Sequence, residues 1–111
     1  MNAIADLQPR PWHAIYKACG INPVLPPLEE KSLADYVEGH AKERGSKPAI
    51  EFLGVSINYA QLDTLANRAA NMLAKLGVGQ GDVIGIHLPN TPQYLISIIA
   101  ASKLGAIVSG V

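Results

Sequence analysis

The chain has 111 residues, enough for one domain, and 49% of them are hydrophobic, which excludes an intrinsically disordered tail. Nine basic residues balance nine acidic ones, and aromatic residues make up only 5%, so nothing favours a nucleic-acid-binding surface. The single cysteine, Cys19, cannot form an internal disulfide, so we expect a reducing compartment and a buried or packing thiol.

Residues 1–30 are expected to form a proline-rich leader, and residues 31–111 a folded unit. Five prolines in the leader forbid regular structure over most of its length. A short helix fits between them, from about Trp12 to Cys19, closed by Gly20. Trp12, Ile15 and Tyr16 share one face of it and are expected to hold the leader against a larger body.

The apolar stretch Leu95–Val111 does not read as a membrane span. It is short, contains Lys103 and is interrupted by two glycines, so we interpret it as a buried helix followed by a buried strand. Residues 1–6 lack the basic cluster and apolar core of a secretory signal. We therefore expect a cytoplasmic protein, with peripheral attachment of a larger parent to a membrane left open.

The first main helix is predicted from Ser32, its N-cap, to Arg44, with Asp35 completing a near capping box and Gly45 ending it. Glu38 is expected to face water with Lys42 and Glu43. The predicted inward stripe is Leu33, Tyr36, Val37, His40 and Ala41.

A β-hairpin and a long helix follow. The strands Ala49–Phe52 and Val55–Ile57 flank Leu53-Gly54, where glycine permits positive φ. Asn58 and Gln61 form a capping box for the next helix, which Gly77 ends. Its apolar positions have helical spacing: Leu62, Leu65, Ala66, Ala69, Leu73 and Leu76.

The last elements are predicted to form a parallel βαβ unit. Val83–Leu88 is nearly continuous in apolar residues, which is typical of a strand covered on both faces. Thr91 is the expected N-cap of a helix with Pro92 at its first position, and that helix ends at Gly105. Ala106–Val108 opens the second strand. Because such a pair needs more strands and helices than this chain supplies, we expect an α/β fold that is incomplete alone.

No motif supplies a catalytic, cofactor-binding or metal site. The glycine-rich segment Gly77–Asp82 follows a helix and precedes a strand, so it is interpreted as a C-cap and turn, not as a phosphate loop. His13, His40 and His87 lack metal-ligand spacing. No convincing carboxylate pair for acid/base catalysis is found among Glu51, Asp63 and Asp82.

The order of these elements resembles the beginning of adenylate-forming (AMP-binding) enzymes, most closely the fatty-acyl-CoA synthetases. The resemblance covers Lys47–Val111 and rests on Ile57–Leu62, Ala66–Ala70, Leu76–Val83, Leu88–Gln93 and Lys103–Val108. In the leader, Pro11-Trp12-His13 with Tyr16 and Gly20-Ile21 looks like the fatty-acyl branch. Asn58 and Gln61 depart from the family's Thr and Glu but remain compatible with a capping box.

The resemblance implies that residues 31–111 are the truncated start of the N-terminal domain of such an enzyme. It implies a parent that activates a fatty or other carboxylic acid with ATP and Mg²⁺ and transfers the acyl group to coenzyme A. The family's phosphate loop and lid lysine have no counterpart here, so this chain is expected to be an inactive scaffold.

Two alternatives remain open at this point. A small α/β interaction module could complete its sheet by dimerising or by pairing with another chain through the open edge after Val108. A miniature nucleotide-binding βαβ protein is the other alternative, and ATP titration would test it.

Overall fold

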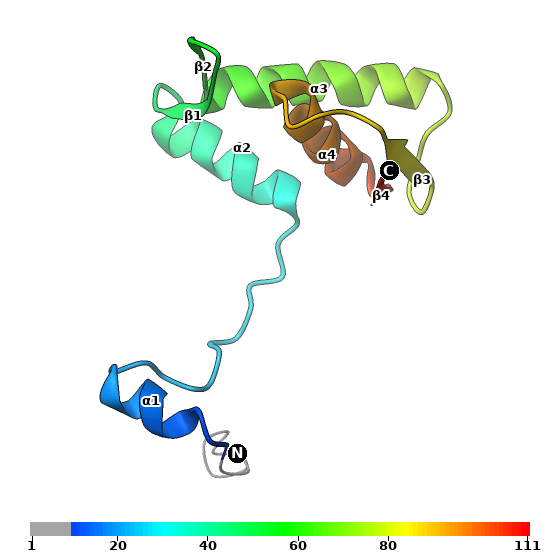
Figure 1. Ribbon diagram of the computed structural model, residues 1–111. Helices are drawn as coiled ribbons and strands as arrows, with labels where there is room; N and C mark the ends of the chain where they lie inside the picture. Colours follow the sequence, from blue (N-terminus) through cyan, green and yellow to red (C-terminus); the bar gives the residue numbers. More distant parts are fainter. Residues whose placement is uncertain (1–9) are drawn as a thin grey trace. The chain divides into compact units, whose positions relative to one another are not determined.

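The computed structural model describes residues 10–111, in two units that divide after Glu30 (Figure 1). The predictions for residues 1–6 therefore lie outside the described residues. In the first unit, α1 (His13–Ala18) is a short helix that ends as predicted, with Gly20 at φ +67° and the Ile21 N–H donating to the Tyr16 carbonyl. The helix α1 buries no side chain, and Cys19, its C-cap, is exposed. The prediction of a buried or packing thiol was therefore wrong.

The second unit packs three helices together, with a small sheet near each end of α3 (Figure 1). Its helices are α2 (Leu33–Arg44), α3 (Tyr59–Lys75) and α4 (Pro92–Leu104), and each packs against the other two. The central core residues are Val37, Leu62, Ala66 and Ile99.

The helix α2 begins as predicted, and its predicted inward stripe is confirmed at Val37, with His40 and Ala41 half-buried, but is wrong at its first two positions. The Asp35 N–H donates to Ser32 Oγ and the Ser32 N–H donates to Asp35 Oδ2, which lowers the pKa of the Asp35 carboxyl. Leu33 and Tyr36, predicted to face inward, are 46% and 42% exposed, whereas Ala34 and Val37 are buried. The smaller alanine lets α2 approach α4 closely enough for the Ala34 N–H to donate to Ser102 Oγ at 3.1 Å.

The predicted hairpin is confirmed as β1 (Pro48–Phe52) and β2 (Val55–Asn58), which pair antiparallel. Both turn residues have positive φ, +47° at Leu53 and +79° at Gly54, as a type I′ turn requires. Ile50 lies opposite Ile57, and both pack against the core between the helices.

The helix α3 starts with the predicted capping box between Asn58 and Gln61. Its inward face is Leu62, Ala66 and Ala70 at i, i+4 and i+8. The predicted stripe was therefore right at its start and wrong at its end, where Leu76 is 74% exposed.

The parallel βαβ unit is confirmed: β3 (Val83–Ile86) pairs with β4 (Ile107–Gly110) in parallel, with Val83 opposite Ile107. Gly105 ends α4 in the left-handed conformation at φ +68°. Thr91 is at the predicted N-cap, but its hydroxyl donates to the Pro89 carbonyl and does not cap the helix.

The β3–β4 sheet is covered on one face only. Ile86 is 4% exposed, whereas Val83 is 65% and Ile107 54% exposed. This confirms the expectation that the chain supplies too few helices and strands to cover both faces, and that its α/β fold is incomplete alone. The outer face therefore presents apolar side chains of a type usually buried in parallel sheets.

Candidate functional site

The side chains considered as catalytic or metal-binding candidates are not brought together. His13 belongs to α1, His40 to α2, and His87 follows β3. His40 is half-buried and its ring lies 5.3 Å from that of Tyr59, which is a packing contact. Among residues 10–111 no group of three or more His, Cys, Asp or Glu side chains could hold a metal ion.

The glycine-rich segment between α3 and β3 is a turn, as predicted. Gly77 and Gly81 have φ of +91° and +83°. The Gly79 N–H donates to Asp82 Oδ2 at 2.7 Å, and the Gly81 N–H donates to the Gly105 carbonyl. Because these amides are occupied and a carboxylate lies beside them, the segment does not fit a nucleotide phosphate.

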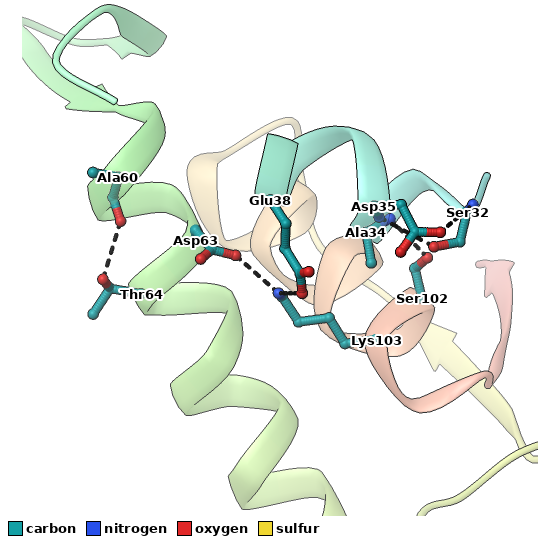
Figure 2. Close-up of polar contacts among 9 residues, drawn as sticks. All are labelled: Ser32, Ala34, Asp35, Glu38, Ala60, Asp63, Thr64, Ser102 and Lys103. Atoms are coloured by element: carbon teal, nitrogen blue, oxygen red, sulfur yellow. Dashed lines mark hydrogen bonds and ion pairs between the residues drawn. The ribbon is translucent and has the colours of Figure 1, made fainter. Parts of the chain in front are cut away.

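The most developed polar cluster joins the three helices around Lys103 (Figure 2). The Lys103 Nζ atom donates to Glu38 Oε1 on α2 at 2.6 Å and to Asp63 Oδ1 on α3 at 2.8 Å. The Lys103 side chain is only 8% exposed, while those of Glu38 and Asp63 are 44% and 23% exposed. We call these three residues the Lys103 cluster.

The electrostatics of the Lys103 cluster are those of a stabilising contact. Burial disfavours the ammonium charge, but the hydrogen bonds to Asp63 and Glu38 outweigh burial and raise the pKa of Lys103 above its usual value. The lysine is thus held charged between two carboxylates and is not available as a general base or as a phosphate ligand.

Sequence reasoning missed the Lys103 cluster. From the sequence, Glu38 is expected to face water, and Asp63 is expected to form no convincing pair with another carboxylate. The available signal was Lys103 itself, a charged residue within the most apolar stretch of the chain. A buried charge needs a partner, and that requirement alone would have pointed to acidic residues on the neighbouring helices.

Two of the hollows on the surface of the second unit lie beside its helices and differ in polarity. A polar hollow of about 340 Å³ lies beside the Lys103 cluster, lined by Asp35, Asn67 and Asn71 among others. An apolar hollow of about 520 Å³ lies where β2 meets the first half of α3; we call it the β2–α3 groove. Its lining includes Val55, Ile57, Ala60, Leu65 and Arg68. Among residues 10–111, neither hollow is lined by a group of three or more His, Cys, Asp or Glu side chains that could hold a metal ion.

No helix in the part that the structure describes is long and apolar enough to cross a membrane. Leu95–Val111 instead forms most of α4 and all of β4; the helix and the strand are as interpreted from the sequence, but β4 is mostly exposed in this chain and not buried.

Comparison with known proteins gives a consistent set of matches. The family model described as "AMP-binding enzyme" matches residues 37–111, which is more than half of the chain. An acetyl-coenzyme A synthetase of Dictyostelium discoideum is 38% identical over 64% of this chain, which spans 11% of that protein. The medium/long-chain-fatty-acid–CoA ligase FadD6 of Mycobacterium tuberculosis is 35% identical over 73% of this chain, which spans 14% of that protein.

Solved structures show the same similarity. A putative long-chain-fatty-acid CoA ligase from Rhodopseudomonas palustris superposes with a TM-score of 0.71 at 28% identity, over 77% of this chain and 22% of that one. The NpsA N-terminal subdomain of Klebsiella oxytoca gives a TM-score of 0.70 at 23% identity, over 73% of this chain and 21% of the subdomain. At that identity the second match shows the fold alone. The fold described above is therefore a part of such an N-terminal subdomain.

Proposed function

The chain belongs to the AMP-binding enzyme family of adenylate-forming ligases, and on that basis we propose that it is the structural N-terminal part of a fatty-acyl-CoA synthetase. The reaction proposed for the whole protein joins a fatty acid to AMP with loss of pyrophosphate. The thiol of coenzyme A then displaces AMP to give the acyl thioester. Residues 10–111 would contribute framework to this enzyme and no reacting group.

The observation that carries this proposal is the βαβ unit with its uncovered face. The family match spans α3, β3, α4 and β4, and the outer face of β3–β4 presents Val83 and Ile107 to solvent. Parallel sheets are stable when helices cover both faces. The proposed role of the chain is to supply two strands and one covering helix to a larger sheet.

ATP, Mg²⁺ and coenzyme A are proposed as cofactors of the whole protein, not of this chain. The glycine-rich turn is occupied internally, and Lys103 is held by two carboxylates. On these two grounds we propose that the described residues bind no nucleotide and that none of them is catalytic. The cytoplasm is proposed as the location, in keeping with an exposed free thiol at Cys19.

A fatty acid is proposed as the substrate because of the similarity to FadD6 and to the Rhodopseudomonas palustris structure. The similarity to an acetyl-coenzyme A synthetase makes a short acid the principal alternative. These two alternatives predict opposite preferences in one assay.

The test is pyrophosphate release by the protein encoded by the complete reading frame that contains this chain. Acetate, octanoate, palmitate and 4-coumarate are compared at equal concentration with ATP, Mg²⁺ and coenzyme A. We expect octanoate or palmitate to give the highest rate. A preference for acetate or 4-coumarate would overturn the fatty-acid assignment, and no pyrophosphate release with any acid would count against the ligase activity.

The 111-residue chain is tested separately by calorimetric titration with ATP and by the same release assay. We expect neither heat of binding nor product. Saturable ATP binding by this chain would overturn its assignment as framework and favour the nucleotide-binding alternative.

A further inference from the structure

The tip of the β1–β2 hairpin carries an unusual residue for its conformation. Leu53 has φ +47°, a region that glycine, asparagine and aspartate adopt more readily than leucine. The hairpin turn imposes this φ, but the Leu53 side chain is 88% exposed, so little of it packs against the described residues. An apolar side chain held out in this way is suited to contact another molecule.

A groove that could accommodate such a side chain lies next to the hairpin. The β2–α3 groove begins at Val55, two residues after Leu53, and has an apolar wall formed by Ile57, Ala60 and Leu65. Its volume of about 520 Å³ is far larger than a leucine side chain needs. The exposed Leu53 side chain, which we call the knob, and the lining of the groove thus belong to one continuous stretch, Leu53–Arg68, from the hairpin turn into α3.

We propose that two copies of this chain associate about a two-fold axis, each inserting Leu53 into the β2–α3 groove of the other. A two-fold interface uses the same patch twice, so it requires a knob and a receptor side by side on one surface. The hairpin and the groove meet that requirement. This association does not depend on the activity of the larger enzyme.

The charges beside the knob and the groove are complementary. Glu51 is exposed two residues before Leu53, and Arg68 is exposed on the groove lining. Insertion of the hairpin tip brings the carboxylate of one copy toward the guanidinium of the other, which favours this pairing over a reversed one.

A lipid surface fits the hairpin less well than a second copy does. Residues 51–56 contain no lysine or arginine, and the Glu51 carboxylate would face the headgroup phosphates. A second copy instead offers an apolar receptor for Leu53 and a cation for Glu51.

The experiment is sedimentation velocity of the 111-residue chain over a concentration series, comparing wild type with Leu53→Asn. Asparagine suits the positive φ of the turn, so the variant should fold at least as well as wild type. We expect a concentration-dependent dimer in wild type that is weakened about tenfold or more by Leu53→Asn, with an unchanged or higher melting temperature. The matched control is Leu76→Asn, because Leu76 is 74% exposed at the other end of α3. It should leave the dimer intact.

A charge exchange provides a second measurement. Glu51→Arg and Arg68→Glu should each weaken the dimer, and the double variant should recover most of the lost affinity. The proposal is overturned by a monomeric wild type, by association that Leu53→Asn leaves unchanged, or by equal loss in Leu76→Asn. A double variant no stronger than the singles, or Leu53-dependent binding to phosphatidylserine vesicles without a dimer, would also overturn it.

Discussion

The Nζ atom of Lys103 on α4 lies 2.8 Å from Oδ1 of Asp63 on α3, and together they connect two helices through a contact that is largely shielded from water. Glu38 completes the contact from α2. The three helices are therefore joined by charge as well as by apolar packing, and the consequences of removing the charge can be measured.

Replacing Lys103 with methionine should destabilise the fold strongly. The substitution keeps the apolar stem but leaves the Glu38 and Asp63 carboxylates without their common partner. The two carboxylates are partly exposed and regain some contact with water. We therefore expect the free energy of unfolding to fall by about 2–3 kcal/mol, which is less than the full cost of an unpaired buried charge. Urea unfolding followed by circular dichroism measures it. Lys75→Met, at an exposed end of α3, should change stability by less than about 0.5 kcal/mol. Equal unfolding midpoints for the two variants would refute a stabilising role for the cluster.

The raised pKa of Lys103 predicts the pH range in which this stability is lost. A lysine whose folded-state pKa exceeds its unfolded value, ~10.4, stabilises the fold fully below that value. The contribution then declines as pH rises through the folded-state pKa. Unfolding midpoints measured between pH 8 and pH 11.5 should fall more steeply in wild type than in Lys103→Met. Parallel profiles would show that Lys103 is not the group responsible.

The local elements of this fold could be predicted from the sequence because their signals are local. The capping boxes at Ser32 and Asn58 each lie within four residues, and the left-handed position of Gly105 is a property of glycine itself. The parallel pairing of β3 and β4 followed from an apolar strand, a helix and a second strand joined by short connections.

The features that could not be predicted depend on how the helices meet. Lys103 is separated by 40 residues from Asp63 and by 65 from Glu38, so no spacing rule relates them. Only the first turn of the buried face of α2 was misassigned: Leu33 and Tyr36 are large side chains that were expected to face inward, whereas close approach to α4 selects the small Ala34. The β2–α3 groove likewise exists only where the hairpin meets α3.

Two N-cap residues that look alike in sequence should behave differently on mutation. The Asn58 Oδ1 atom accepts the Gln61 N–H at 2.8 Å, so Asn58→Ala should lower the free energy of unfolding by about 1 kcal/mol. Asn58→Asp keeps an acceptor oxygen and should keep most of this stabilisation. The Thr91 side chain makes no capping hydrogen bond, so Thr91→Ala should lower the free energy of unfolding by less than about 0.5 kcal/mol. Thermal unfolding of the three variants is the measurement. A larger loss for Thr91→Ala than for Asn58→Ala would contradict the assignment of the caps.

Gly45, the C-cap of α2, and Gly39, in the middle of α2, should respond in opposite directions to substitution by alanine. A Cβ atom at Gly45 would lie 2.5 Å from the Ala41 carbonyl oxygen and 3.2 Å from Ala60 Cβ, so the junction with α3 must shift, at a cost of about 1–3 kcal/mol. At Gly39, inside the helix, nothing lies within 4 Å, and alanine should stabilise by about 0.5–1 kcal/mol through its better helix propensity. Urea midpoints of the two single variants compare them directly. If Gly45→Ala were as stable as Gly39→Ala, the close approach of α2 to the start of α3 would not constrain this position.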